Sequence, residues 1–239
     1  MEWREQAIVL GAKRHGETSA IVNVLTFEHG RHAGLVRSGR SRRMRPVLQQ
    51  GNIVEVTWRA RLEEHLGSFI VEPVALNAAL IMDEPLKLAG VTTLTALCAL
   101  LPEREPHPAL YEGARLVLDN IDNDEVWPAL LVRWEAGLLD SLGFGLDLSK
   151  CAATGQADNL VYVSPKSSRA VSAVAGEPYK DRLLTLPGFL LGSGIASTAD
   201  LVAGFALTGY FLHRHLAVPR AIELPDSRER MIEYLKDQS

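Results

Sequence analysis

The chain has 239 residues, 47% of them hydrophobic, and a formal net charge of −4 at pH 7. This length and composition predict a soluble globular protein with a sizeable core, divided into two small domains. The longest apolar region, residues 89–101, is too short for a membrane-spanning helix, and residues 1–6 carry charges of both signs, unlike a secretory or transit signal. We therefore expect a cytoplasmic protein without a membrane partner.

The charge is distributed unevenly along the chain. Residues 1–61 contain 11 Lys and Arg against 5 Asp and Glu, a net of +6, whereas the remainder contains 14 against 24, a net of −10. Such an asymmetry predicts that one end binds a polyanion and that the other has a different use.

Short apolar runs separated by turn signals predict a small β domain at the N-terminus. We expect strands at residues 6–13, 20–27, 31–36, 52–61 and 68–72, which suit a five-stranded OB-type barrel. In the fourth strand an apolar face, Val54-Val56-Trp58, alternates with an outer face that includes Arg59. Gly16 and Gly30 supply the positive φ of tight turns.

Residues 38–50, SGRSRRMRPVLQQ, lie between the third and fourth strands. This segment contains too few apolar residues to pack as an element, so we expect a mobile basic loop.

After Ala78 the apolar period becomes helical. Pro85 suits the first turn of a helix, and Gly143 suits the end of another. Two apolar stripes mark the helices between them: Leu110, Tyr111, Ala114, Val117, Leu118 and Ile121, then Trp127, Leu130, Leu131, Trp134 and Leu138.

The last third of the chain combines a hairpin with further helices. Strands at 160–164 and 169–174 predict a hairpin subdomain within residues 147–176. Helices resume at Ser197, which has capping-box spacing to Asp200 and precedes an apolar stripe of Leu201, Phe205, Thr208 and Leu212. A last helix opens at Asp226, with Glu229 three residues on.

A cluster of basic residues is the strongest functional signal. It comprises Arg37, Arg40, Arg42, Arg43 and Arg45, joined by Lys13 and Arg14 at the end of the first strand and by Arg59. Charge runs are more often solvated surface, but here they gather in an otherwise acidic chain, which favours contacts to nucleic-acid phosphates. The domain has few aromatic residues for base stacking, and Trp58 faces the core, so we expect electrostatic, sequence-indifferent binding.

Other chemistry has little support. We interpret His213-Arg214-His215 as a solvated helix end, because residues two apart face different directions, and Gly192-Ser193-Gly194 as a plain turn. Cys98 and Cys151 lie in different contexts, which disfavours a disulfide, and no catalytic motif is present. We predict no catalytic residues, no metal and no cofactor.

Residues 7–43, AIVLGAKRHGETSAIVNVLTFEHGRHAGLVRSGRSRR, resemble the start of the RecO DNA repair family. Further along, Arg133-Trp134-Glu135 through Leu142-Gly143-Phe144-Gly145, followed by Cys151, resembles that family's pattern RxxExxLLxxLGxGxxLxxC. The resemblance implies an α+β, multidomain protein with a basic, DNA-binding OB fold at 1–77 and an acidic helical domain at 78–239.

The resemblance also implies a function. Such recombination mediators bind single- and double-stranded DNA at the nucleoid, anneal complementary strands, associate with RecR, engage the acidic tail of the single-stranded DNA-binding protein, and help to load RecA. Arg133 is the residue that would receive the acidic tail, although it could instead be a helical arginine at the edge of an apolar stripe.

The sequence departs from the family's pattern at one place. Zinc-containing members carry two Cys-x-x-Cys pairs, whereas Thr154 stands three residues after Cys151. The inserted subdomain at 147–176 is therefore expected to be zinc-finger-like but to lack the cysteine ligands and the zinc.

Two alternatives stay open. An OB-fold RNA-binding or ribosome-associated adaptor would carry a similar basic surface, because phosphate contacts alone do not distinguish DNA from RNA. An enzyme with an active site around Cys151 is the third hypothesis.

Overall fold

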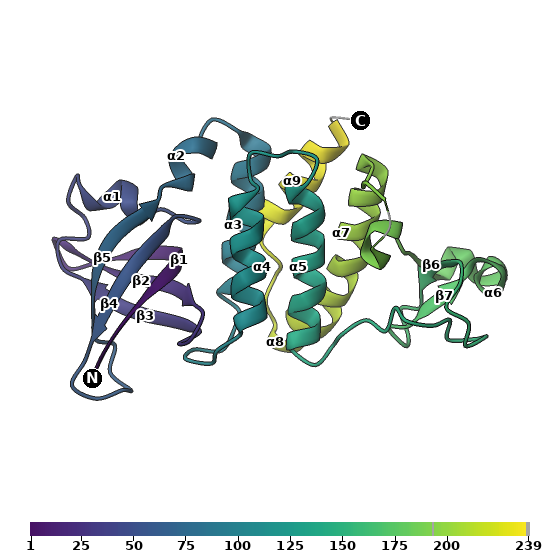
Figure 1. Cartoon of the computed structure of the whole chain (residues 1–239), viewed down its shortest axis with the longest axis horizontal. Helices are drawn as coiled ribbons and strands as arrows, with labels where there is room; N and C mark the ends of the chain where they lie inside the picture. Colours follow the sequence, from purple (N-terminus) through teal and green to yellow (C-terminus); the bar gives the residue numbers. More distant parts are fainter. Residues whose placement is uncertain (193, 238–239) are drawn as a thin grey trace. The chain divides into compact units, whose positions relative to one another are not determined.

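The computed structural model describes residues 1–192 and 194–237. The chain forms two compact units, Met1–Asp119 and Asn120–Ser239, each of which is described here by itself (Figure 1). Ser193, part of the predicted glycine turn, lies outside the described residues. None of the helices in the described part of the chain has the length and apolar character that crossing a membrane requires.

The first unit begins with a closed five-stranded barrel. Its strand order is β1-β2-β3-β5-β4. The strands are β1 (Glu2–His15), β2 (Ser19–Thr26), β3 (Arg31–Val36), β4 (Ile53–Arg59) and β5 (Ser68–Ala75). The predicted OB-type barrel is therefore confirmed, within a fold that combines strands and helices.

The first strand is longer than predicted because its two halves have different partners. Residues Glu2 to Ile8 pair with β4 and residues Ala7 to His15 pair with β2, so that only Ala7 and Ile8 pair with both. The register of the β1–β2 pair shifts between Val9 and Gly11, as at a β-bulge, where the strand bends from one neighbour to the next. The early start was missed because residues 2–6, apart from Trp3, are charged or polar.

The alternation predicted in the fourth strand is confirmed. Val54, Val56 and Trp58 are buried, whereas Arg59 is exposed. They join the apolar core of the barrel with residues of every other strand. The two predicted turn glycines, Gly16 and Gly30, have φ of 59° and 63°.

The expectation that residues 38–50 pack no element is wrong. The segment contains a helical turn, α1 (Met44–Val47), and its Val47 and Leu48 are buried in the barrel core. Asn52 Nδ2 donates to the carbonyls of Pro46 and Val47 at 2.8 and 3.0 Å, which fixes the end of the turn. Two apolar side chains at the end of a basic run are therefore enough to anchor it.

Helices complete the first unit. They are α2 (Asn77–Ile81), α3 (Pro85–Cys98) and α4 (Pro108–Asp119). Pro85 occupies the first turn of α3, as predicted, and the stripe from Leu110 to Ile121 is buried. The loop between α3 and α4 touches the barrel through a parallel bridge between Arg31 and Glu103.

The second unit is built on three longer helices, α5 (Trp127–Ser141), α7 (Thr198–Leu212) and α9 (Asp226–Asp237). A π-helical turn at His213–Ala217 and the short α8 (Val218–Arg220) follow α7. The predicted capping box of Ser197 and Asp200 is present, and Gly143 follows α5 with a φ of 84°. The stripe of Leu201, Phe205, Thr208 and Leu212 is buried, as predicted; of the other stripe, only Leu130 is partly exposed.

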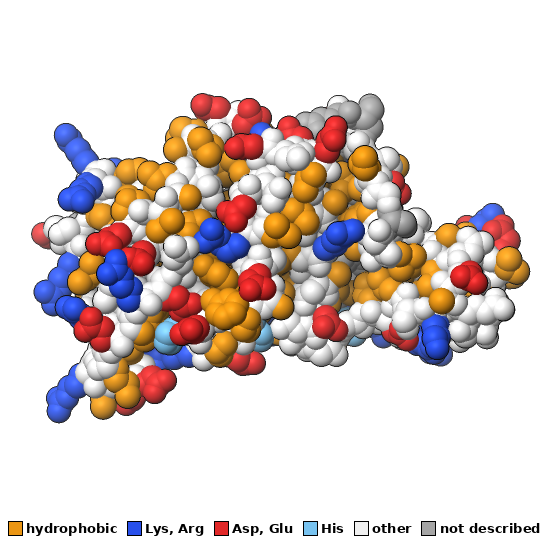
Figure 2. Space-filling view, viewed as in Figure 1, with side chains coloured by type: hydrophobic (Ala, Val, Ile, Leu, Met, Phe, Trp, Pro, Cys, Tyr) orange, Lys and Arg blue, Asp and Glu red, His pale blue; other side chains and the backbone are white. Residues whose placement is uncertain are grey.

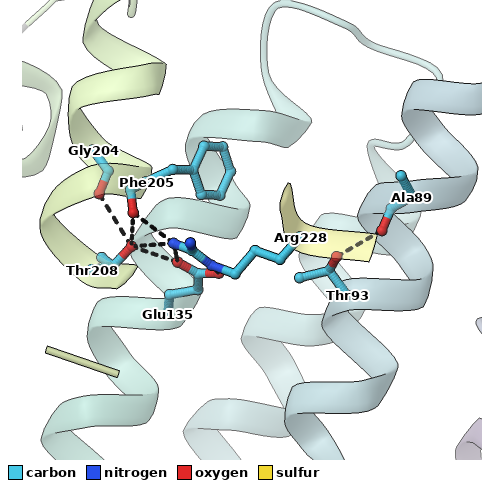
Figure 3. Close-up of polar contacts among 7 residues, drawn as sticks. All are labelled: Ala89, Thr93, Glu135, Gly204, Phe205, Thr208 and Arg228. Atoms are coloured by element: carbon cyan, nitrogen blue, oxygen red, sulfur yellow. Dashed lines mark hydrogen bonds and ion pairs between the residues drawn. The ribbon is translucent and has the colours of Figure 1, made fainter. Parts of the chain in front are cut away.

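A buried ion pair ties these three helices together (Figure 3). Arg228 of α9 donates from Nε and Nη2 to the two carboxylate oxygens of Glu135 on α5, at 2.8 Å each. Thr208 of α7 donates its hydroxyl to the same carboxylate. The Glu135 and Arg228 side chains are 0% and 7% exposed, and the Arg228 guanidinium lies over the Phe205 ring. Burial of both charges is tolerated because their hydrogen bonds are largely satisfied.

A small sheet with the order β7-β6-β8 follows α5 in the chain. Its strands are β6 (Leu160–Val163), β7 (Ala170–Ser172) and β8 (Leu184–Thr185), and α6 (Ala173–Gly176), η1 (Glu177–Arg182) and η2 (Gly188–Leu191) flank β8 in the sequence. The predicted hairpin is confirmed, but its third strand was missed because β8 has only two residues.

Candidate nucleic-acid interface

A groove with a volume of about 740 Å³ opens on the first unit, beside the barrel. Five of the residues that line it are basic and none is acidic. The basic residues are Lys13, Arg14, Arg31, Arg40 and Arg45; backbone and side chains of Leu10, Gly11, Ala12, Ala20, Asn23, Gly39, Leu48, Gln49, Gln50 and Ala99 complete the lining. A cation-lined hollow without carboxylates suits an anionic ligand.

The fold brings these residues together from separate parts of the sequence. Lys13 and Arg14 stand where β1 pairs with the start of β2, opposite Ile21 and Ala20. Arg45 belongs to α1, which is held against the barrel by the buried Val47 and by the buried Leu48 that follows the helix. The side chain of Gln50 donates to the carbonyl of Leu10 at 2.9 Å and joins the two walls of the groove.

Four of the predicted site residues line the groove: Lys13, Arg14, Arg40 and Arg45. Lys13, Arg14 and Arg45 are exposed, and within the described residues their side chains form no hydrogen bond or ion pair. Their positive charges are therefore free to interact with a bound anion. Arg40 differs, because its guanidinium is bonded to backbone carbonyls.

The other predicted barrel residues lie elsewhere. Three further arginines, Arg37, Arg42 and Arg43, are exposed on residues 37–45, which we name the basic segment, but do not line the groove. In the described part of the chain their side chains also have no bonded partner. Arg59, on β4, forms an ion pair of 2.8 Å with Glu2 and is not brought to the groove. Figure 2 shows Lys and Arg side chains projecting around the barrel, on the left of the view.

Sequence reasoning missed several lining residues, Arg31 among them. Arg31 Nε donates to the carbonyl of Leu101 at 2.6 Å, and Nη1 lies 3.1 Å from a carboxylate oxygen of Glu103, so its charge is partly compensated. A lone arginine at the start of a strand carries no signal in the sequence. Asn23, Gln49 and Gln50 are ordinary polar residues whose convergence only the fold reveals.

Apart from Phe27, which is 38% exposed, the aromatic residues of the barrel offer little surface for base stacking. Trp58 and Phe69 are buried, and Trp3 is stacked on His29 with ring centroids 4.1 Å apart and on Trp58 at 5.8 Å. His32 packs edge-on against this cluster. Burial lowers the pKa of His32, and the positive charge of Arg104 lowers it further, so the ring is neutral at pH 7.

Arg133 lies in the second unit, on the exposed face of α5. Its Nη2 donates to the carbonyl of Phe189 at 2.6 Å, which ties η2 to α5. The residue remains exposed and so could also contact an anion.

The cysteines are both free and buried. Burial raises the pKa of the Cys98 thiol. For Cys151 burial also raises the pKa, but hydrogen bonds from Ser172 and Thr154 lower it more, to about 6. The Ser172 amide donates to Cys151 Sγ at 3.3 Å. Because Cys151 has no exposed surface, a substrate cannot reach its sulfur in this conformation.

The remaining sequence motifs show no assembled site. His213 and Arg214 are exposed, and His215 stacks on Phe144 with ring centroids 4.5 Å apart. Over residues 1–192 and 194–237, no three His, Cys, Asp or Glu side chains come together as metal ligands. That the hairpin subdomain holds no zinc stays a prediction.

Comparison with known proteins adds independent evidence. The family model described as Recombination protein O N terminal matches residues 1–76, and the one described as Recombination protein O C terminal matches residues 82–221. The chain is 56% identical to a DNA repair protein RecO of Methylorubrum extorquens, over 97% of both chains. It is 55% identical to a DNA repair protein RecO of Rhizobium etli, over 98% of this chain and 92% of the relative. The chain therefore belongs to the recombination protein O, or RecO, family.

Proposed function

We propose that the chain is a recombination mediator of DNA repair that binds single- and double-stranded DNA, anneals complementary strands and assists the loading of RecA together with RecR. RecO proteins are non-catalytic mediators, so membership in the family agrees with the expectation that the chain is not an enzyme. The observation that carries the proposal is the groove of the first unit, with five cations and no carboxylate.

The proposed DNA contacts are electrostatic. In the groove, phosphates would contact Lys13, Arg14 and Arg45. The contact would extend along the basic segment through the exposed Arg37, Arg42 and Arg43. The remaining residues of the proposed DNA interface are Arg40 and Arg59. Each phosphate of a single strand that a cation neutralises releases counterions. The logarithm of the binding constant therefore falls with the logarithm of the salt concentration, with a slope of about −0.7 per contact. Since Trp3 is already stacked against His29 and Trp58, base identity should matter little.

Strand annealing follows from the same charges without bond chemistry. Two complementary strands repel each other through their phosphates, and a surface that neutralises both lowers that repulsion so that base pairs can form. The acidic remainder of the chain would not bind the DNA strands and would instead contact protein partners. We accordingly propose a division of labour between residues 1–77, for DNA, and 78–239, for RecR and the single-stranded DNA-binding protein.

The decisive experiment measures annealing of complementary oligonucleotides at low and high salt. A variant with Arg40, Arg42, Arg43 and Arg45 all changed to alanine should anneal poorly, and wild type should lose activity as salt rises. The matched control changes four exposed cations of the second unit to alanine: Lys166, Arg182, Arg230 and Lys236. It loses the same total charge and should anneal like wild type. Absence of DNA binding by wild type in dilute buffer would refute the proposal.

Competition between single-stranded DNA and RNA separates this function from an RNA-binding adaptor. We expect DNA to compete at least as well as RNA of the same length and sequence. A preference for RNA of tenfold or more would favour the adaptor instead. Thiol labelling of the folded protein tests the enzyme hypothesis, since a buried Cys151 should react slowly.

We further propose that Arg133 receives the acidic tail of the single-stranded DNA-binding protein. Arg133→Ala should abolish affinity for the tail peptide. Because the same substitution removes the hydrogen bond to the Phe189 carbonyl, circular dichroism must show an unchanged fold. Unchanged peptide affinity in a folded variant would leave Arg133 with a structural role only.

A further inference from the structure

Arg40 is bonded differently from the other arginines of the basic segment. Its Nη1 donates to the carbonyls of Gly16 and Glu17, at 3.0 and 2.6 Å, in the turn between β1 and β2. Its backbone amide donates to the carbonyl of Thr18 at 3.0 Å. One residue thus makes three hydrogen bonds to consecutive carbonyls of a turn that lies more than twenty positions away in the sequence.

The two residues before Arg40 allow this close approach. Gly39 is buried, and a Cβ at this position would lie 2.9 Å from the Cβ of Ala20 and 3.1 Å from the carbonyl oxygen of Val36. Ser38 adopts a φ of 55°, a conformation that side-chain-bearing residues seldom adopt. Such backbone strain persists only where surrounding contacts hold it in place. The contacts at Ser38-Gly39-Arg40, which we name the clip, therefore act together.

The clip joins two walls of the groove. Lys13 and Arg14 precede the β1–β2 turn, and Arg45, in α1, follows Arg40 by five residues. If the segment moved away from the turn, these cations would no longer face one hollow. A preorganised binding surface loses less conformational freedom on binding, so it binds more tightly than a mobile one that carries the same charges.

We infer that Arg40 is a positioning residue of the proposed DNA interface, which it serves by holding the basic segment against the β1–β2 turn. This inference rests on the proposed function, but the clip itself can be tested without DNA. Arg37, Arg42 and Arg43 would contact phosphates, whereas Arg40 would act chiefly through the backbone carbonyls that it already binds.

Lysine in place of arginine separates the two roles. Arg40→Lys keeps the charge but cannot reproduce the planar arrangement of guanidinium donors. We expect Arg40→Lys to bind a fluorescently labelled oligothymidine about tenfold more weakly than wild type, as expected when charged hydrogen bonds are lost. The matched control, Arg43→Lys, keeps the charge of an arginine without bonded partners and should bind within about twofold of wild type.

A second variant perturbs the clip without touching any charge. Gly39→Ala should push the segment off Ala20 and weaken oligothymidine binding as Arg40→Lys does. By contrast, Arg43→Ala should weaken binding modestly and reduce the magnitude of the salt slope by about 0.7, the effect of one lost phosphate contact on a single strand. Circular dichroism and thermal unfolding would verify that each variant retains the barrel.

Trypsin provides the readout that does not depend on DNA. The enzyme cleaves after Arg42 and Arg43, so release of the segment in Arg40→Lys or Gly39→Ala should accelerate cleavage there severalfold, whereas Arg43→Lys should be cut at the wild-type rate. Wild-type cleavage and wild-type binding in Arg40→Lys would overturn the inference. If wild type fails to bind DNA while the clip variants are still cleaved faster, the proposed function fails and the clip stands.

Discussion

Arginines of the first unit's basic segment and the buried arginine of the second unit differ in what their guanidinium groups contact. In the first unit Arg42 and Arg43 are exposed, and the described residues provide no bonded partner for their side chains. In the second unit Arg228 is almost fully buried and donates hydrogen bonds to Glu135, Thr208 and the carbonyl of Phe205. The guanidinium is thus available to a ligand at Arg42 and Arg43 and committed to the fold at Arg228.

This difference teaches where a charge contributes to stability and where to binding. An exposed guanidinium stays hydrated, so its removal costs the fold little. A buried one gives up its hydration, and only a well-placed carboxylate and further acceptors offset that loss. The bonds of Arg228 and Glu135 reach residues of α5, α7 and α9, so the pair links all three helices.

The largest expected effect comes from breaking the buried pair. Arg228→Ala should lower the free energy of unfolding by about 3 to 5 kcal/mol, because Glu135 is left as an uncompensated buried charge. Urea unfolding followed by circular dichroism measures the change. Arg230→Ala, on the same helix but exposed, is the control and should change the free energy by less than about 0.5 kcal/mol. Equal effects at both positions would break the comparison.

A smaller effect is expected at the hydroxyl that completes the network. Thr208→Val keeps the shape of the side chain but removes the hydrogen bond to Glu135. The carboxylate keeps its bonds to Arg228, so the loss should be about 1 to 3 kcal/mol, as for one buried hydrogen-bond partner. A loss as large as that of Arg228→Ala would mean that the hydroxyl, not the ion pair, holds the helices together.

The first unit also contains a buried histidine, His32, which would carry a positive charge if protonated but is neutral at pH 7. The pKa of His32 lies below its ordinary value of 6.5 because of burial. The unfolded chain therefore takes up the proton first: the contribution of His32 to stability is complete above pH 6.5 and is lost as pH falls below it. Unfolding at pH 7 and pH 5.5 should show a smaller acid-induced loss of stability in His32→Phe than in wild type. An equal loss in both would assign the acid sensitivity to other groups.

The smallest effect on stability is expected from the basic segment. Arg43→Ala should leave the free energy of unfolding within about 0.5 kcal/mol of wild type, although it weakens DNA binding. Thermal unfolding and oligonucleotide binding of one preparation would test both halves of this prediction. A clear loss of stability would show that even the exposed arginines are part of the fold.

Local patterns in the sequence predicted most of the elements. Alternation at Val54, Val56 and Trp58 revealed a barrel strand, and the spacing of Ser197 and Asp200 revealed a helix start, because each depends only on neighbours along the chain. The packing of 38–50 was missed because Val47 and Leu48 are few among many polar residues. The two-residue strand β8 offered too short a pattern to recognise.

The site was predictable in composition but not in arrangement. The basic residues stood out by number, yet nothing in the sequence distinguishes Arg40, which binds a distant turn, from Arg43, which does not. Likewise Glu135 and Arg228 are 93 residues apart, and each by itself looks like a surface residue of an amphipathic helix. Long-range pairs of this kind depend on how the chain closes on itself.

The position of Arg228 has a consequence for how much of the chain is indispensable. The family match in the C-terminal part ends at residue 221, before α9 begins, so a fragment designed on that match would omit the last helix. Glu135 would then lose both of its hydrogen bonds to Arg228 and be left as an uncompensated buried carboxylate. A late nonsense mutation that deletes α9 alone should consequently harm folding as much as a missense change at a core residue in the middle of the chain.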